Sequence, residues 1–239
     1  ALAAETINIK ADKQVEWHQK DNKMVAIGNA IATKGDMDIK SDKMTGFYDT
    51  INDKSSIKTV HAVGNVIMTS PQAKAYGDTM DYDLQKDEAI LKGNPAKIKT
   101  DKETISATES IIYYPSKEKA IAKGDIEIVD KDGNKIFSDN LTTFFKKSST
   151  GSLEIDRIEI NTNVKIVTKD ATVTSKRGTY NPQNSMVYLY DNVTITQQNG
   201  NVLKGDKAES NLNTGISKLI STQTSGRVTG TFKEKAKEK

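Results

Sequence analysis

Apolar and polar residues alternate in short runs along most of the chain. Two clear examples are Ile126-Glu127-Ile128-Val129 and Val193-Thr194-Ile195-Thr196. A period of two sends alternate side chains to opposite faces of an extended backbone, so such runs predict β-strands. Asp132-Gly133 and Asn199-Gly200 each lie between two runs and can adopt the positive φ of type I′ turns, which predicts hairpins at both places.

One four-residue pattern returns along the chain: an apolar residue, a spacer, a small residue and usually a polar residue. A second anchor, typically Gly-Asn, follows each copy. Two interlocked anchors at intervals of 30 to 37 residues indicate about seven structural repeats. The fourth positions are Asp12, Asp42, Asp78, Thr108, Asp139, Lys176 and Asp206, and the second anchors are Gly28-Asn29, Gly64-Asn65, Gly93-Asn94, Gly124-Asp125, Thr162-Asn163, Asp191-Asn192 and Gly226-Arg227.

Each repeat holds about four strands or strand pieces and cannot cover its own apolar face, so neighbouring repeats must stack. Gly and Asn tolerate positive φ, and the Gly-Asn pairs therefore predict a tight bend or bulge next to a strand. Extra residues in the second and fifth repeats, around 49–56 and 146–152, predict surface loops. The expected fold is an elongated sheet structure whose terminal strands are exposed.

Composition agrees with a sheet protein and narrows its class. Ile, Val and Thr far outnumber Leu, which favours sheet over helix. The 35 basic and 32 acidic residues are interspersed, so they form no basic stripe for nucleic acid. No run approaches the roughly 18 apolar residues of a membrane-spanning helix. Because the chain has no Cys, a disulfide framework, a thiolate metal site and a thiol nucleophile are excluded.

The two ends of the chain differ from the repeats. Ala1-Leu2-Ala3-Ala4 resembles the end of a secretory signal, so residues 1–4 are expected to be a leader remnant. Residues 233–239 contain only Lys, Glu and Ala and are expected to form a solvated, charged tail. No linker rich in Pro, Gly or Ser divides the repeats, so residues 5–232 are expected to form one continuous domain.

Candidate chemistry is sparse. His18 and His61 lie far apart in the sequence, and nothing groups carboxylates around them to complete a metal site. Asp81 and Asp83 lie on one strand face, but they alternate with apolar residues and are expected to face solvent. Residues 130–134 are expected to form a turn, because Gly is misplaced for a calcium loop. The sequence predicts no catalytic residue, no metal and no cofactor.

The apolar face is the remaining candidate. Large apolar groups alternate at Ile7/Ile9, Val15/Trp17 and Met80/Tyr82/Leu84. A slot between two sheets about 10 Å apart can be filled by such side chains as a plain core, or it can be left open for an acyl chain. Met and Trp suit deformable ligand surfaces. The candidate lipid-binding residues are Ile7, Ile9, Trp17, Met80, Tyr82 and Leu84.

These patterns resemble the periplasmic lipopolysaccharide-transport proteins of the LptA/OstA-like family. The resemblance is carried by residues 7–12, 27–35, 39–44, 77–84 and 90–94, which read INIKAD, IGNAIATKG, IKSDKM, GDTMDYDL and ILKGN. The resemblance to the family is good over residues 5–130, and residues 131–232 form additional repeats. It implies a β-jellyroll of two facing antiparallel sheets whose groove holds lipid acyl chains and includes Ile7, Ile9, Met80, Tyr82 and Leu84. It also implies head-to-tail joining through edge strands into a bridge between the inner and outer membranes.

The leading hypothesis is therefore a non-catalytic periplasmic protein that binds lipopolysaccharide, shielding its lipid A acyl chains, and that pairs with other jellyroll domains. The strand around Thr6 to Lys10 is the expected docking edge, and monomers or short oligomers are expected. Three alternatives stay open: a β-helical protein that binds or cleaves polysaccharide, a purely structural assembly module, and a periplasmic fragment of another component of the same pathway. Few aromatic residues, 6% of the chain, argue against the polysaccharide alternative.

Overall fold

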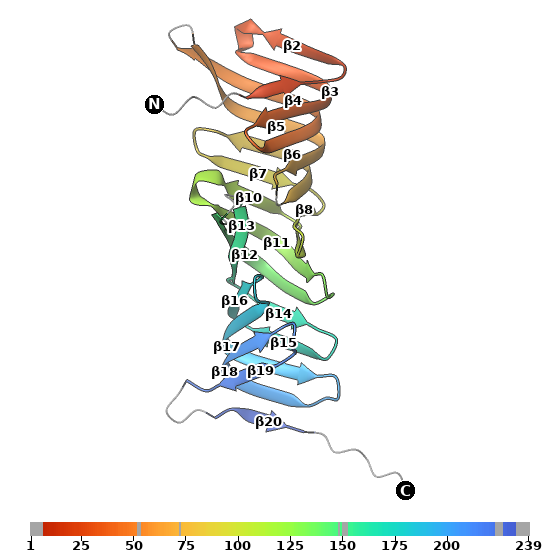
Figure 1. The fold of residues 1–239 in the computed structure, drawn as a ribbon, viewed down its shortest axis with the longest axis vertical. Helices are drawn as coiled ribbons and strands as arrows, with labels where there is room; N and C mark the ends of the chain where they lie inside the picture. The colour runs from red at the N-terminus through yellow and green to blue at the C-terminus, as the bar shows by residue number, and fades with distance from the viewer. Residues whose placement is uncertain are drawn as a thin grey trace.

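The computed structural model describes residues 7–51, 54–71, 73–147, 149, 153–222 and 227–232. The expected leader remnant at 1–4, the charged tail at 233–239 and Gly226 of the last anchor lie outside these residues. In Figure 1 the body is elongated, with β2 near one end of its long axis, β20 at the other, and successive strands crossing that axis in chain order.

The described residues form twenty strands and short 3-10 turns at Gln19–Asp21 (η1) and Pro115–Lys117 (η2). Every strand pairing recorded among the described residues is antiparallel, so the parallel β-helix alternative is wrong. No helix in the described ranges has the length and hydropathy needed to cross a bilayer. The strands are β1 Asn8–Lys10, β2 Gln14–His18, β3 Lys23–Lys34, β4 Met37–Ile51, β5 Lys54–Thr69, β6 Lys74–Asp83, β7 Glu88–Lys92, β8 Ala96–Lys99, β9 Glu103–Ala107, β10 Ser110–Tyr114, β11 Lys119–Asp130, β12 Lys135–Lys147, β13 Leu153–Ile160, β14 Val164–Val167, β15 Ala171–Ser175, β16 Arg177–Asn181, β17 Met186–Gln197, β18 Val202–Asn211, β19 Ser217–Ile220 and β20 Thr229–Thr231.

The strands form two facing layers, because the long strands bend in the middle and contribute one half to each layer. The first layer runs β2, β3, β4, β5, β6, β7, β10, β11, β12, β13, β16, β17, β18 and β19, and the second runs β1, β3, β4, β5, β6, β8, β9, β11, β12, β14, β15, β17, β18 and β20. At about 4.8 Å between strands, each layer is on the order of 60 Å long. The predicted all-β jellyroll of two facing antiparallel sheets is confirmed.

β3 and β5 bend at predicted second anchors, whereas β4 shifts register between Lys40 and Lys43, at a first anchor. Gly28 and Asn29, like Gly64 and Asn65, have positive φ, and the strand register shifts at both pairs. The two anchors of a repeat also contact each other: the side-chain amide of Asn29 donates to Asp12 Oδ2 at 2.8 Å. The same bond joins Asn65 to Asp42 at 2.8 Å and Asn163 to Asp139 at 2.6 Å. The carboxylate of the first anchor thus holds the left-handed Asn at the bend, which explains why both positions recur together.

The predicted hairpins are present, but their turns are of a different type. At Asp132-Gly133 only the Gly has positive φ, and Gly133 N–H donates to Asp130 O while Asp130 N–H donates to Asn134 O. Gly200 repeats this arrangement. A type I turn followed by a left-handed Gly suits the twist of the flanking strands as well as a type I′ turn does, so the prediction of type I′ is wrong.

The expected loop at 49–56 is largely strand. Asp49 to Ile51 continue β4, residues 54 to 56 begin β5, and Asp49 pairs with Ser56. In the fifth repeat Lys146 and Lys147 likewise belong to β12. In the second repeat the extra residues lengthen a hairpin, because two adjacent strands can keep pairing beyond the edge of their neighbours. Residues 148 and 150–152 of the other expected loop lie outside the described residues.

Candidate functional site

The inner faces of the two layers enclose a slot. In the first layer one row of cross-strand neighbours runs from end to end: Val15, Ala26, Met44, Ala62, Met80, Leu91, Ile111, Ala122, Leu141, Ile160, Gly178, Leu189, Ala208 and Leu219. The facing row of the second layer runs from Ile9 through Ala32, Ile39, Met68, Ala75, Ile98, Ile105, Ile128, Ile136, Ile166, Val173 and Ile195 to Leu203. The bends close one long edge of the slot, and we call the opposite edge its mouth.

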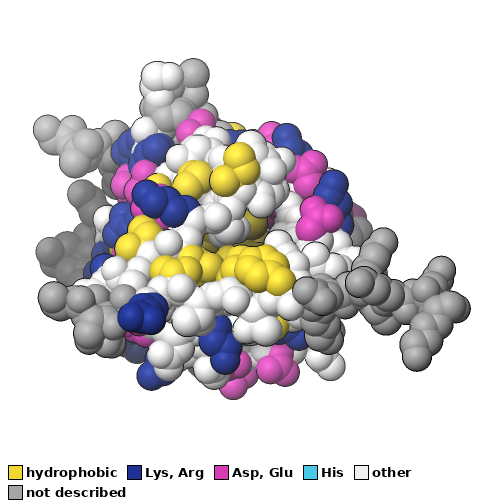
Figure 2. All heavy atoms as spheres, turned by 90° about the horizontal axis from the view of Figure 1, so that it is seen from below, with side chains coloured by type: hydrophobic (Ala, Val, Ile, Leu, Met, Phe, Trp, Pro, Cys, Tyr) yellow, Lys and Arg dark blue, Asp and Glu magenta, His cyan; other side chains and the backbone are white. Residues whose placement is uncertain are grey.

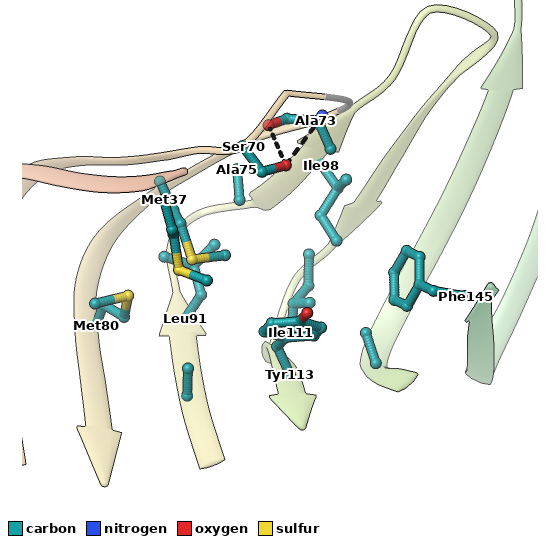
Figure 3. A pocket seen from close by; sticks show the side chains of 13 residues that line it. Met37, Ser70, Ala73, Ala75, Met80, Leu91, Ile98, Ile111, Tyr113 and Phe145 are labelled. Atoms are coloured by element: carbon teal, nitrogen blue, oxygen red, sulfur yellow. Dashed lines mark hydrogen bonds between the residues drawn. The ribbon is translucent and has the colours of Figure 1, made fainter. Parts of the chain in front are cut away.

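An apolar cavity of about 120 Å³ lies in this slot, and with the open space in front of it the volume reaches about 830 Å³. Its lining comes from strands of both layers, and Figure 3 shows the side chains converging on one space. Met37, Met68 and Phe145 are only partly buried, so the cavity opens at the mouth. The lining residues are Met37, Met68, Ser70, Ala73, Ala75, Met80, Ala89, Leu91, Ile98, Ile111, Tyr113, Ala120 and Phe145.

Small side chains make the room. Ala75 of the second layer and Ala89 and Ala120 of the first are almost fully buried and carry only a methyl group into the slot. The alternation of large apolar residues in the sequence does not mark these three positions. The signal that could have found them is Ala at inward positions where other repeats place Ile or Leu.

Few polar atoms reach the cavity. Ser70 lies at its upper edge in Figure 3, where its hydroxyl donates to Ala73 O at 3.2 Å. Tyr113 packs edge-on against Phe145, with 6.0 Å between ring centroids. Burial, with smaller effects from Tyr82, Asp87 and Glu118, raises the pKa of the Tyr113 phenol, which therefore stays neutral. The lining is uncharged and suits an apolar occupant.

Three of the six predicted residues follow one another along β6 and just beyond it. Met80 is 1% exposed and lines the cavity. Tyr82 is buried and Leu84 partly buried in the same core, but neither lines the cavity. All three face inward, and the structure brings them to one side of the slot.

The other three predicted residues lie at the N-terminal end of the slot. Ile7 and Ile9 are partly buried against the core. A side chain at Gly46 would meet Ile9 Cδ1 at 3.9 Å, so Ile9 reaches across to the first layer. Trp17 continues an inward-facing row but is 63% exposed, and its Nε1 donates to Tyr48 Oη at 2.7 Å. These residues cap the end of the slot and do not line the cavity.

His61, Asp81 and Asp83, the titratable candidates from the sequence, lie outside the slot. Asp81 contacts His61 at 2.5 Å on the exposed face, while Asp83 accepts the backbone N–H groups of Gln85 and Lys86 in a turn, and these bonds lower its pKa. Within the described residues, no three His, Cys, Asp or Glu side chains are grouped to hold a metal. His61, Asp81 and Asp83 therefore each make a surface contact that gives the residue a structural role.

The C-terminal end of the slot is apolar. Figure 2, which views this end, shows hydrophobic side chains gathered in a hollow between the layers, with charged side chains around it. Leu203 and Leu219 are partly buried there. Ile216, Val228 and Phe232 are 70%, 44% and 68% exposed. Because β19 and β20 each pair with β18 alone among the described strands, this end also presents free strand edges.

Comparison with known proteins gives two kinds of match. The family described as "LptA/(LptD N-terminal domain) LPS transport protein" matches residues 8–119 and, a second time, residues 110–216. Among solved structures the chain is similar to LptH, the LptA homologous periplasmic component of the lipopolysaccharide transport device from Pseudomonas aeruginosa. That similarity has 22% identity and a TM-score of 0.40, and it covers 46% of this chain and 76% of LptH. No curated protein sequence matches.

Proposed function

The chain belongs to the LptA/LptD N-terminal-domain family of lipopolysaccharide-transport proteins, and from this premise we propose that it binds lipopolysaccharide in the periplasm and shields the acyl chains in its slot. We further propose that it acts without catalysis and forms part of a bridge between the inner and outer membranes. The cavity at the mouth carries the proposal, because it is the place where an apolar chain can leave water without displacing the core.

The physical chemistry of the cavity supports an acyl ligand. Removing an acyl chain from water is favourable by about 0.8 kcal/mol for each buried CH₂ group. The cavity lining offers no charge that an acyl chain would have to desolvate, and the open mouth lets the rest of the chain extend out of the enclosed space of about 120 Å³. Met37, Met68 and Met80 add flexible side chains that can adapt to chains of different length.

Mutations that fill the cavity test this site. In the Ala75→Leu/Ala89→Leu variant, two larger side chains enter the cavity from opposite layers. We expect purified hexa-acylated lipopolysaccharide to bind about tenfold more weakly, or about 1.4 kcal/mol, in a displacement assay with fluorescent lipopolysaccharide. The matched control is Lys74→Leu, which adds the same side chain on the exposed face of the same strand. Circular dichroism of each variant establishes that it is folded.

The outcomes distinguish a failure of the proposed function from a failure of the proposed acyl site. If the parent chain does not bind lipopolysaccharide above background, the proposed function is wrong. If the parent binds and the filled variant binds equally well, the cavity is not the acyl site. Equal weakening by Lys74→Leu would show that the loss has no connection with the cavity.

The free edges at both ends support the bridging part of the proposal. β1 and β2 each pair with β3 alone among the described strands, so an upstream jellyroll domain can add a strand there. Pro at Ile9 removes a backbone donor from β1. We expect folded Ile9→Pro to capture less of a partner jellyroll domain in a pull-down, and unchanged capture would exclude docking at this edge. Filaments that grow with concentration would contradict the expectation of monomers or short oligomers.

A further inference from the structure

The two halves of the slot have the same strand register but different side-chain packing. The cavity takes its lining from Met37 to Phe145, where Ala, Met and Ser occupy many inward positions. We call this part of the slot the N-terminal compartment. The rows of inward positions continue without interruption toward the C-terminal end, and the size of the side chains along them changes.

Beyond the cavity the inward positions mostly carry larger, branched side chains. A group of inward Ile, Leu and Val side chains is at most 1% exposed, and these side chains define the C-terminal compartment: Ile158, Ile160, Val164, Ile166, Val187 and Leu189. Gly178 also faces this part of the slot, but Leu189 occupies the space in front of it: a Cβ at Gly178 would lie 2.9 Å from Leu189 Cδ2. An acyl chain could enter only by displacing packed side chains, which close packing makes costly.

A buried carboxyl group lies where the two compartments meet. Glu103 begins β9, next to the strand whose Ile98 lines the cavity, and it shares the inward face with Ile105 and Ala107. Glu103 is 4% exposed, and its Oε2 has no hydrogen-bond partner within the part of the chain that the structure describes. An unpaired carboxyl oxygen of this kind opposes the entry of an apolar chain and also opposes its own burial.

Tyr180, on β16 of the first layer, is buried near enough to Glu103 for the two to interact electrostatically. It is 3% exposed, and its phenol has a raised pKa caused first by burial and then by the charge of Glu103, with Asp130 and Asp132 contributing less. Nearby, Lys102 Nζ donates to Gln183 Oε1 at 2.8 Å, and Gln183 Nε2 donates to Ile155 O at 3.1 Å. The first bond joins the β8–β9 turn of the second layer to the β16–β17 turn of the first, and the second bond ties that turn to β13.

We propose that Glu103 and Tyr180 mark the end of the ligand site, so that acyl chains occupy the N-terminal compartment alone and the C-terminal compartment is a packed spacer. This inference rests on the proposed function and assigns the two family-matched halves different tasks. The first half together with its neighbouring strands holds the lipid. The second half extends the body toward its C-terminal docking end.

Tryptophan reporters can locate an acyl chain along the slot. The chain has a single Trp, so Trp17→Phe gives a background without Trp emission. Tyr113→Trp then places a reporter in the cavity, and Tyr180→Trp places one beyond Glu103. The probe is a brominated fatty acid, which quenches Trp emission on contact. We expect the Tyr113→Trp reporter to lose most of its emission and the Tyr180→Trp reporter to keep it.

A second pair of variants tests Glu103 itself. Glu103→Ala in the Tyr180→Trp background removes the carboxyl group and opens space beside the cavity, and we expect quenching of that reporter to appear. Glu127→Ala removes a carboxylate from the exposed face of β11 and should leave the emission unchanged. Unfolding curves of all four reporter proteins verify that each is folded.

Each result decides between the two proposals. Quenching of neither reporter would refute acyl binding and with it the proposed function. Quenching of both reporters in proteins with Glu103 would leave the proposed function intact and overturn the boundary. If Glu103→Ala leaves the second reporter unquenched, the assignment of the boundary to Glu103 is wrong.

Discussion

Replacing Glu103 by Gln tests whether the carboxyl group in the slot destabilises the protein. Burial raises the pKa of Glu103 above its ordinary value of 4.5; the hydrogen bond with Thr100 and the charge of Lys102 oppose this effect, and Asp130 adds to it. When the pKa of a carboxyl group is higher in the folded state than in the unfolded state, the group contributes its full stabilisation at pH values below the unfolded-state pKa. That stability is lost as pH rises from 4.5 through the folded pKa.

The magnitude follows from the burial of an unsatisfied polar group. Leaving such a group without a partner costs about 2 kcal/mol, which for a chain of this size is about 4–8 °C in Tm. Glu103→Gln removes the charge but leaves an unpaired amide group, so we expect it to be more stable than the parent at neutral pH. Glu103→Met removes the polar group, and we expect it to gain about 2 kcal/mol. Below pH 4.5 Glu103→Gln and the parent should have equal stability, because the Glu103 carboxyl group is then neutral in both states.

Thermal unfolding followed by circular dichroism, at neutral pH and below pH 4.5, measures this difference. Glu103→Met removes the polar group altogether and should gain at least as much as Glu103→Gln. The control is Glu127→Gln on the exposed face, where the contact with Lys135 at 3.3 Å is worth at most about 1 kcal/mol. A Glu103→Gln variant that is less stable than the parent at neutral pH would refute the reasoning, since it would mean that the carboxylate is ionised and well partnered.

Three further predictions concern packing and bends, all measured by urea unfolding. Leu189→Ala should cost about 2–5 kcal/mol because Leu189 is fully buried in the packed compartment, and unchanged stability would contradict close packing there. Gly64→Ala should destabilise the protein more than Gly35→Ala does. Both glycines have positive φ, which costs an Ala about 1–2 kcal/mol. At Gly64 the added Cβ would also collide with Asp42, whereas at Gly35 the space is open. Asn65→Ala loses the bond to Asp42 and should cost about 1 kcal/mol, so an unaffected variant would show that the paired anchors do not hold the bend.

Local patterns in the sequence determined the strands, the repeats and the bends. Alternation along a strand is a property of neighbouring residues, so runs such as 126–129 predict their own structure. The Asp and Gly-Asn anchors recur because each repeat needs a left-handed bend and a carboxylate to hold it, as Asp42 and Asn65 do. Inward positions such as Met80 follow from the same alternation.

Tertiary structure alone decided where the slot is open. Whether two inward faces touch depends on residues from strands far apart in the chain, as when Met37 and Phe145 line one cavity. The turn type at Gly133, the extended hairpin at 49–56 and the exposure of Trp17 at an end likewise depend on neighbouring strands. The reason is physical: secondary structure follows from local periodicity, whereas an empty volume is what remains after all neighbouring side chains have packed.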